Sequence, residues 1–333
     1  MNTESARRVG ILLATYNGAR FVEQQIVSLK ENETPFVLHW VDDHSSDDTR
    51  EAVYRAAHKC QIEMREWQLP DKQGYPGTFL YLMECVDADI YLFCDQDDIW
   101  QPGKIDATVA NLLDETSLPA LCFSDPLMFN QGEPETLRNL FDVLGLSAKN
   151  IIQPSRAFTF VPALGNTIGV TRPLRDLFMR HSDIARAYAF AHDWWMYIIA
   201  LSSGSVRLLS DVPTTLWRQH GNNYSSAFFR RRRRGVGEFR MDRRITSLLR
   251  HLYSRQAEGF VLASATLSPG PKLERLLAVA RLVATLDRQQ SAGDLLRLVR
   301  LKAMTPRTRA AFNLAASCLW SDATWGSQDL VDT

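Results

Sequence analysis

The chain has 333 residues, a formal net charge of zero and 45% hydrophobic residues, enough to bury a sizeable core in one large domain with an appendage. It contains no run of about 18 apolar residues and no apolar stretch at the N-terminus, so we expect neither a transmembrane helix nor a signal peptide. Its five cysteines form no Cys-x-x-Cys pair, which indicates reduced thiols in the cytoplasm rather than disulfides or a zinc site.

The first predicted elements are a strand and a helix. A short apolar strand that begins at Val9 ends in a small polar turn, Thr15-Tyr16-Asn17. Apolar residues at helical spacing follow over residues 21–29.

A second apolar strand, residues 36–41, ends in two carboxylates, Asp42 and Asp43. Because they stand at the strand end itself, either one could accept a hydrogen bond from a base or a ribose. The later acidic pair at 47–48 is interpreted as capping the helix that follows.

A glycine-containing loop over residues 69–78 precedes the next predicted helix. Glycine lets the backbone approach a ligand closely, and a helix N-terminus favours anions. We interpret Lys72 and Gly74 as neighbours of a bound phosphate, although a surface turn would have the same composition.

The third predicted strand, residues 90–94, runs directly into Asp95, Asp97 and Asp98. Open α/β sheets bind ligands beyond the carboxyl ends of their strands. Two carboxylates one residue apart repel each other unless a cation lies between them, and Mg²⁺ sites combine such carboxylates with phosphate oxygens. The residues alone leave two interpretations open, a metal site or an acidic turn with solvated side chains.

These segments resemble family 2 glycosyltransferases with the GT-A fold. The motifs that carry the resemblance are Thr15-Tyr16-Asn17, the string Val41-Asp42-Asp43-His44-Ser45-Ser46-Asp47-Asp48-Thr49, and Asp95-Gln96-Asp97-Asp98. It covers about residues 8–225, and the longer string from Cys94 to Lys104 is similar to the rhamnosyltransferase-like members that decorate bacterial polysaccharides. It implies an α/β fold with a Rossmann-like, mixed, mostly parallel sheet flanked by helices.

The resemblance also implies an inverting, metal-assisted transfer of a sugar from a nucleoside diphosphate, dTDP or UDP, to a hydroxyl. Together with Lys72 and Gly74 of the glycine-containing loop, the residues assigned to the donor nucleotide are Thr15, Tyr16, Asn17, Asp42, Asp43 and Asp95. The relatives often carry an Asn-rich segment at the end of that loop, where this chain has Gly77-Thr78-Phe79. The resemblance assigns Asp95 and Asp97 to a bound Mg²⁺ or Mn²⁺.

A later segment, residues 164–170, is rich in small residues and resembles the part that lines the acceptor side of these sites. Gly165 and Asn166 are assigned to that side, and the glycines suggest a close backbone approach. An ordinary strand with glycine kinks would look the same.

Asp193 begins an aromatic, apolar helix that runs to about residue 201. A carboxylate there could be a helix cap. The resemblance instead aligns Asp193 with the general base, and both roles are compatible because a first-turn carboxylate stays ionised beside the positive helix end. Trp194 and Trp195, which follow it, are assigned to the acceptor side.

The last motif, Arg218-Gln-His220-Gly-Asn-Asn, is similar to a string in the rhamnosyltransferase-like relatives. An isolated histidine is usually structural or on the surface. The resemblance implies that His220 binds the metal or contacts the diphosphate, with Arg218 nearby on the acceptor or diphosphate side. Neutral imidazole is a suitable third ligand beside two carboxylates.

Charge divides the chain unevenly. Residues 1–229 carry 19 basic and 29 acidic side chains, a net charge of 19 − 29 = −10, whereas residues 230–333 carry 19 and 9, a net charge of 19 − 9 = +10. We place a domain boundary at the run of five arginines that begins at Arg230. Helices are predicted beyond it over residues 241–253, 273–286, 294–301 and 306–320.

This basic helical C-terminal region has two interpretations, attachment to an anionic membrane surface or a basic cover for the acidic domain. It contains no recognised nucleic-acid-binding motif, so nucleic acid is not an expected partner.

We therefore expect a cytoplasmic enzyme, peripheral on the inner face of the plasma membrane, that transfers a sugar in bacterial surface polysaccharide synthesis. The specific expectation is L-rhamnose, moved to a glycan or a lipid-linked glycan. Two alternatives remain, a nucleotidyltransferase on the same metal site, which would not need Asp193, and a non-catalytic carbohydrate-binding scaffold. The joint presence of the acid pair, Asp193 and His220 argues against the scaffold.

Overall fold

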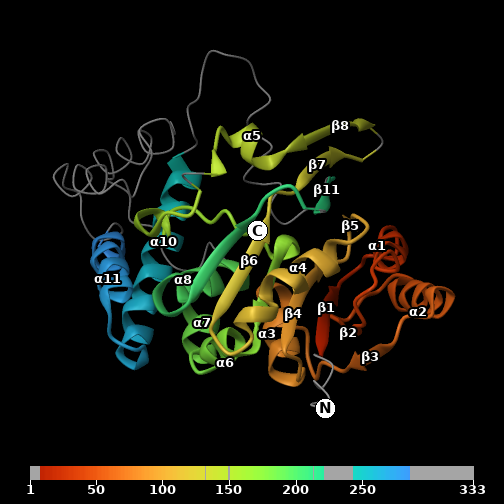
Figure 1. The fold of residues 1–333 in the computed structure, drawn as a ribbon, viewed down its shortest axis with the longest axis horizontal. Coiled ribbons are helices and arrows are strands. Elements are labelled where there is room, and N and C mark those ends of the chain that lie inside the picture. The colour runs from red at the N-terminus through yellow and green to blue at the C-terminus, as the bar shows by residue number, and fades with distance from the viewer. Residues whose placement is uncertain (1–7, 132, 149–150, 213, 221–242, 286–333) are drawn as a thin grey trace.

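The computed structural model describes residues 8–131, 133–148, 151–212, 214–220 and 243–285 as a mixed α/β fold (Figure 1). The larger sheet has seven strands, in the spatial order β10 (Ser205–Leu209), β6 (Ala120–Ser124), β9 (Ile168–Thr171), β4 (Ile90–Asp95), β1 (Val9–Thr15), β2 (Val37–Asp42) and β3 (Met64–Trp67). The smaller sheet has the order β5 (Ile99–Trp100), β11 (Thr215–Gln219), β7 (Leu127–Asn130) and β8 (Glu133–Asn139).

Most neighbouring strands of the larger sheet are parallel, and β9 alone among them runs antiparallel to β4 and β6. The strands β1, β2 and β4 end side by side, because Thr15 pairs with Asp42 and Ala14 pairs with Asp95. The predicted mixed, mostly parallel sheet is confirmed, and so is the common edge to which its strands deliver polar residues.

Helices cover both faces of the larger sheet. The described helices are α1 (Val22–Ser28), α2 (Thr49–Cys60), α3 (Gly74–Cys85), α4 (Lys104–Leu112), α5 (Leu140–Leu144), α6 (Arg172–Met179), α7 (Ser182–Tyr188), α8 (His192–Ser203), α10 (Arg243–Ala263) and α11 (Pro271–Ala284). One apolar cluster joins α1, α2 and α4 to one face, and a second joins α3, α6 and α8 to the other.

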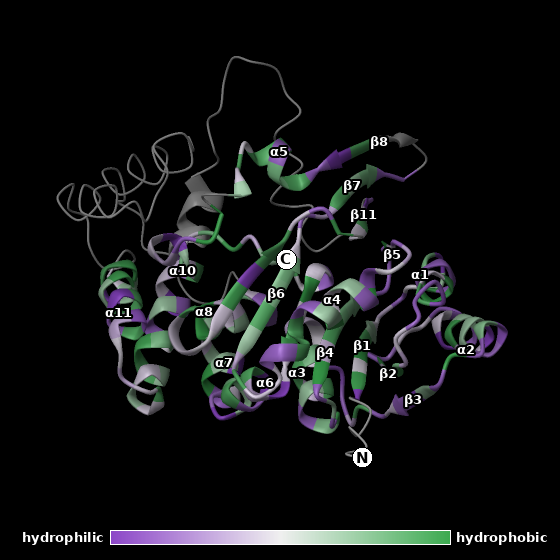
Figure 2. Cartoon of the chain, viewed as in Figure 1, coloured by the Kyte–Doolittle hydropathy of each residue, from purple (hydrophilic) through white to green (hydrophobic). Residues whose placement is uncertain are grey.

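Strand β4 is apolar on both faces because it lies between these two helical layers. Tyr91 and Phe93 belong to one cluster, and Leu92 and Cys94 belong to the other. Figure 2 shows the resulting stretch of hydrophobic residues along β4. A strand buried on both faces reads as a continuous apolar run, which is why the sequence identified it.

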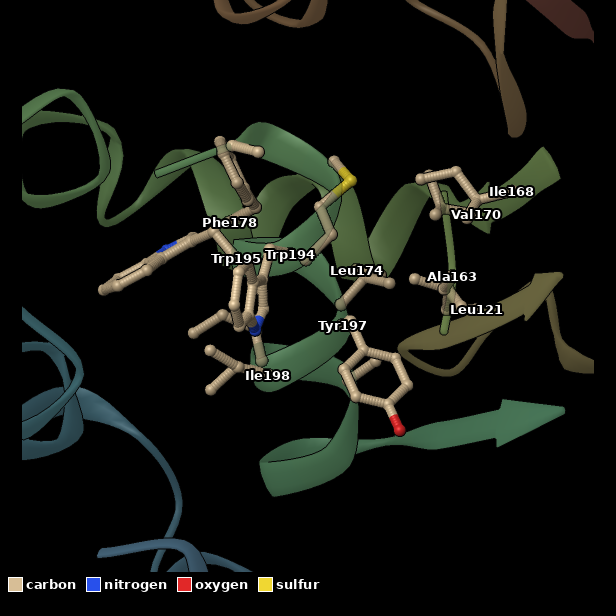
Figure 3. Packing of buried hydrophobic residues seen from close by; sticks show 14 of the residues in the cluster. Leu121, Ala163, Ile168, Val170, Leu174, Phe178, Trp194, Trp195, Tyr197 and Ile198 are labelled. Atoms are coloured by element: carbon tan, nitrogen blue, oxygen red, sulfur yellow. The ribbon is translucent and has the colours of Figure 1, made fainter. Parts of the chain in front are cut away.

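Helix α8 is buried along almost its whole length. Figure 3 shows its Trp195 and Tyr197 packed in one cluster with Leu174 and Phe178 of α6. An apolar helix that is covered on all sides has its position fixed by its neighbours.

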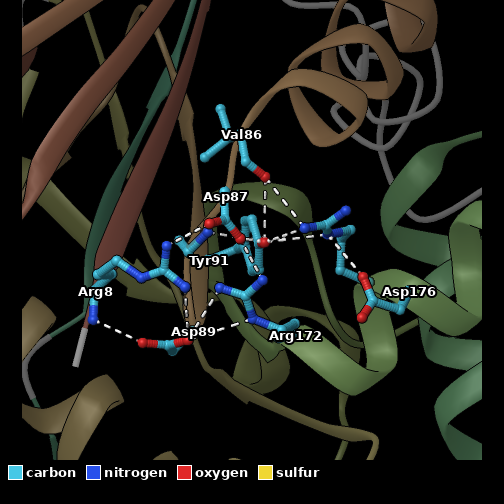
Figure 4. Close-up of polar contacts among 9 residues, drawn as sticks. Arg8, Val86, Asp87, Asp89, Tyr91, Arg172 and Asp176 are labelled. Carbon is cyan, nitrogen blue, oxygen red and sulfur yellow. Dashed lines mark hydrogen bonds and ion pairs between the residues drawn. The ribbon is translucent and has the colours of Figure 1, made fainter. Parts of the chain in front are cut away.

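A charged network joins α6 to the opposite edge of the sheet, away from the strand ends described above (Figure 4). Asp89 accepts hydrogen bonds from the backbone N–H of Arg8 at 2.9 Å and from Arg172 at 3.0 Å. Asp87 pairs with both arginines, and these hydrogen bonds, from Arg172 and then Arg8, hold the pKa of Asp87 below its usual value. The network fastens the start of α6 to the start of β1.

The described part of the basic C-terminal region consists of α10 and α11, which overlap two of the predicted helices. Both contribute to the same hydrophobic cluster as α8. The arginine run, the predicted boundary at residue 229 and the predicted helices over 294–301 and 306–320 lie outside the described residues, so the division into two domains stays a prediction. None of the helices in the described ranges is long and apolar enough to cross a membrane.

Substituting Gly259 tests the close packing of α10 against α7. A Cβ at this position would lie 2.5 Å from Cβ of Tyr188, so we expect Gly259→Ala to lower the free energy of unfolding by about 1–3 kcal/mol, the usual cost of overpacking. Helix propensity alone would favour alanine by about 1 kcal/mol, so the sign of the change is informative. Urea unfolding measures it.

Gly270→Ala is the matched control, because a Cβ there meets no atom within 4 Å. The packing would be contradicted if Gly259→Ala left stability unchanged or raised it.

Candidate functional site

Three loops, which follow β1, β2 and β4, meet at the carboxyl edge of the larger sheet, where the C-terminal ends of these strands lie side by side. The loops after β1 and β2 are joined by Thr15, whose hydroxyl donates to Asp42 Oδ1 at 2.8 Å and accepts from the Trp40 indole at 3.0 Å. Ser45 donates to Asp42 from its backbone N–H at 2.9 Å and from its hydroxyl at 2.6 Å. Asn17 accepts from the backbone N–H of Ser46 at 2.8 Å.

The start of α3 belongs to the same site. Asp43 accepts from the backbone N–H groups of Gln73 at 2.7 Å and Gly74 at 2.8 Å. Gly74 adopts a φ of 63°, a left-handed conformation that glycine takes without strain. The Lys72 ammonium lies 3.6 Å from the centre of the Tyr16 ring. The structure thus brings together all the residues that were assigned to the nucleotide on these loops.

Negative charge accumulates in the loop after β4. Burial, together with the charges of Asp97 and Asp193, raises the pKa of Asp95 to about 8. His220 Nε2 lies 2.8 Å from Asp97 Oδ2, and its ring stacks on Phe21 with the ring centres 4.7 Å apart.

Asp98 is fully buried and braces this loop. It accepts from the Asn166 side-chain amide and, at 3.0 Å, from the backbone N–H of Arg218. Burial and the carboxylates of Asp97 and Asp95 raise the pKa of Asp98, and its two hydrogen bonds oppose that rise. The sequence showed this residue only as one more acid in a run, because its partners lie far along the chain.

The Arg218 guanidinium is a second brace. It donates to the Asp97 carbonyl at 2.7 Å, to Gln131 at 2.7 Å and to Gln24 at 2.6 Å. Arg218 is buried and is not presented to an acceptor. Its side chain joins the smaller sheet and α1 to the acidic loop, the segment after β4 that contains Asp97 and Asp98.

Asp193 is held at the start of α8 by two backbone donors. Its Oδ2 accepts from Gly165 at 2.7 Å, and its Oδ1 accepts from Trp194 at 2.6 Å. Burial raises the pKa of Asp193 to about 6 despite these hydrogen bonds. Gly165 binds Asp193 and the next residue, Asn166, binds Asp98, so Asp193 lies near the acidic loop after β4.

Gly165 lies close to two side chains at the start of α8. A Cβ there would lie 3.2 Å from His192 Nε2 and 3.5 Å from Asp193 Oδ2. Asn166 lies beside it and binds Asp98, so its amide has a structural role next to the acids.

Trp194 and Trp195 lie in the hydrophobic core, not on a surface that an acceptor could reach. Trp195 is 0% exposed and Trp194 is 6% exposed, and the Trp194 indole donates to the Ala157 carbonyl. Their aromatic character reflects the packing of α8, which a sequence pattern does not separate from a sugar-binding role.

The donor set suits a hard divalent cation. Asp95 and Asp97 supply carboxylate oxygens in a place where buried negative charge lacks compensation, and His220 supplies an imidazole. In the described part of the chain, no group of three or more His, Cys, Asp and Glu side chains is arranged around one metal position. The structure joins Asp97 to His220 by a direct hydrogen bond instead.

Comparison with known proteins identifies the class of enzyme and the fold. Residues 11–125 match the family described as glycosyl transferase family 2. The chain is a glycosyltransferase with a family 2 domain. It is 26% identical over 235 residues to the dTDP-rhamnosyl transferase RfbG of Shigella flexneri, which covers 65% of this chain and 74% of RfbG. An uncharacterized glycosyltransferase of Nostoc sp. is 27% identical over 111 residues, covering 31% of this chain and 32% of the relative.

Solved structures show that this glycosyltransferase has the GT-A fold. S. aureus TarS residues 1–349 in complex with UDP-GlcNAc superpose with a TM-score of 0.55 at 15% identity, covering 93% of this chain and 80% of TarS 1–349. The mannosyltransferase PcManGT of Pyrobaculum calidifontis, in complex with GDP-Man and Mn²⁺, gives a TM-score of 0.52 at 17% identity, covering 96% and 89%.

Removing Asp98 tests the bracing of the acidic loop. Asp98→Ala leaves the Asn166 amide and the Arg218 N–H buried without their acceptor, so we expect stability to fall by about 1–3 kcal/mol for each group. Chemical unfolding without added metal measures this change.

Asp48→Ala is the control, because Asp48 is exposed and its side chain makes no cap hydrogen bond. It should change stability by less than about 0.5 kcal/mol. A similarly small effect of Asp98→Ala would show that the carboxylate is not a brace.

Proposed function

We propose that this glycosyltransferase acts with inversion and with the help of a divalent metal, moving a sugar from a nucleoside diphosphate to a hydroxyl. The observation that supports this most is the place of Asp193. It is a buried carboxylate that accepts from the N–H groups of Gly165 and Trp194, and Asn166, next to Gly165, binds Asp98 in the loop after β4. A base in that position can act on a hydroxyl that meets a donor bound at the sheet edge.

In the proposed step, the acceptor hydroxyl gives its proton to Asp193 while its oxygen bonds to the anomeric carbon. The bond from that carbon to the diphosphate oxygen breaks, and the electron pair leaves with the diphosphate. Because the new bond forms on the face opposite the breaking one, the anomeric configuration inverts. This single displacement needs no nucleophile from the protein.

The donor nucleotide is proposed to bind on the joined loops after β1 and β2. Asp42 and Asp43 are fixed by Thr15, Ser45 and the start of α3, so their remaining lone pairs are oriented before the ligand arrives. Lys72 stands over Tyr16 and adds a positive charge on this side.

Asp95 and Asp97, with His220, are the residues that would hold Mg²⁺ or Mn²⁺. Such an ion, when bound, neutralises the charge that develops on the leaving diphosphate. Mn²⁺ is present with GDP-Man in the structurally similar PcManGT, which supports a divalent metal here.

The sugar is proposed to be L-rhamnose, carried by dTDP, and this rests on the similarity to the rhamnosyl transferase RfbG. The acceptor is proposed to be a glycan or a lipid-linked glycan of a bacterial surface polysaccharide, which approaches from the side of Gly165. The basic C-terminal region supports attachment to the cytoplasmic leaflet, where each basic residue near an anionic surface contributes about 1 kcal/mol.

Asp193→Asn tests the base. We expect kcat for transfer from dTDP-rhamnose to fall by about 10²–10⁴, the usual contribution of general-base catalysis, with unchanged donor affinity. Asp183→Asn is a matched control, since Asp183 is also a first-turn helix carboxylate but is exposed. Normal turnover in Asp193→Asn would show that Asp193 is a helix cap and not the general base.

The pH profile gives an independent measurement. The base works only when ionised, and the pKa of Asp193 is raised to about 6. The kcat/KM of the wild-type enzyme should therefore reach its maximum at pH values well above 6 and decline as the pH falls through 6. The residual activity of Asp193→Asn should lack this decline.

Asp97→Ala tests the metal. With one carboxylate left beside the diphosphate, we expect Mn²⁺-dependent binding of dTDP-rhamnose to weaken by at least about 10–100-fold, the loss typical of even indirect metal partners. Thermal stabilisation by donor plus Mn²⁺, screened beside UDP-glucose, UDP-galactose and GDP-mannose, measures both metal and sugar preference. Asp114→Ala, at an exposed acid, should behave as wild type. Equal stabilisation of Asp97→Ala would remove this residue from the metal site.

A further inference from the structure

Gln96 stands between the two proposed metal carboxylates in the sequence, yet its side chain binds the loop after β1. The Tyr16 N–H donates to Gln96 Oε1 at 2.8 Å, and Gln96 Nε2 donates to the Tyr16 carbonyl at 3.0 Å. Backbone pairing of β1 with β4 reaches Ala14 and Asp95. The Gln96 amide therefore continues the contact between these segments one step beyond the strands.

Gly18 leaves the space that this side chain fills. A Cβ at Gly18 would lie 2.1 Å from Gln96 Oε1 and 2.5 Å from Gln96 Cδ, and its three nearest atoms all belong to Gln96. Gly18 does not have a left-handed backbone, so alanine would be unstrained there without Gln96.

Gln96 also connects two sets of contacts. Asn17 follows Tyr16 in the first loop, the loop after β1. Its backbone N–H donates to the Ser45 hydroxyl at 2.8 Å, which joins the first loop to the loop after β2. Asp97 follows Gln96 in the acidic loop, and its Oδ2 lies 2.8 Å from His220 Nε2. The amide links the proposed nucleotide-binding loops to the proposed metal residues.

We propose that Gln96 is a positioning residue that couples nucleotide binding to metal binding through the protein. The inference rests on the proposed function, which places the nucleoside at Tyr16 and the metal at Asp95 and Asp97. A nucleoside that orders the first loop also orders the acidic loop, because two hydrogen bonds tie them together. The metal then binds to residues that are already in place, and linkage requires the same effect in the reverse direction.

The experiment uses a nucleoside without phosphates, so that no direct contact between metal and phosphate contributes. Titration calorimetry gives the Mn²⁺ affinity of the full chain with and without saturating thymidine or uridine. In the wild type we expect the nucleoside to tighten Mn²⁺ binding by about fivefold, the lower end of typical coupling. In Gln96→Ala the factor should fall to about one.

A double-mutant comparison separates this role from a general loss of stability. Gly18→Ala alone should displace Gln96 and reduce the coupling, whereas Gly18→Ala combined with Gln96→Ala should match Gln96→Ala. Gln68→Ala, at an exposed glutamine, should keep wild-type coupling. A purely structural role would lower the melting temperature and leave the coupling factor intact.

Full coupling in both Gln96→Ala and Gly18→Ala would overturn the inference and leave the proposed function standing. A wild-type chain that binds dTDP and UDP but shows no effect of Mn²⁺ on either would overturn the metal assignment, and the inference with it.

Discussion

Negative charge at the carboxyl edge of the large sheet is the constraint on which the rest of the site depends. Burial and neighbouring carboxylates raise the pKa values of Asp95 and Asp98, and burial raises the pKa of Asp193. Folding tolerates these crowded acids because protonation of Asp95 and Asp98 is favoured and because backbone donors and the imidazole of His220 lie around them. A nearby cation favours their ionised forms, so the site is suited to a cation and to an anionic leaving group that the cation holds.

The loops at this edge are held by one another more than by regular secondary structure. In each case a side chain of one loop satisfies the backbone of another, as Asp43 does for the start of α3 and Gln96 does for Tyr16. Buried or partly buried backbone groups need such partners once the strands have ended. The loops are therefore ordered together, which favours a ligand that touches several of them at once.

The general base depends on a different part of the molecule. Its helix, α8, packs against α6 and against the C-terminal helices α10 and α11, and all four helices share one hydrophobic cluster. Gly259 lets α10 approach α7 closely. Helix α7 ends just before the segment that leads into Asp193. Helices α10 and α11, the described helices of the positive C-terminal region, are thus part of the packing that fixes the base.

Apolar runs in the sequence predicted three strands, β1, β2 and β4, and the polar residues at their ends, because a buried parallel strand is a run of apolar residues and its carboxyl end lies beside those of its neighbours. Its resemblance to a known family supplied the order of the motifs, and the fold and the kind of enzyme followed. The side chains that hold the loops together could be identified from the three-dimensional fold and not from the sequence pattern. Asp98, Arg218 and Gln96 find their partners 68, 194 and 80 residues away, and Trp195 is buried by helices distant in sequence. A hydrogen bond depends on distance and angle in space, and neither is encoded in the local pattern that a sequence displays.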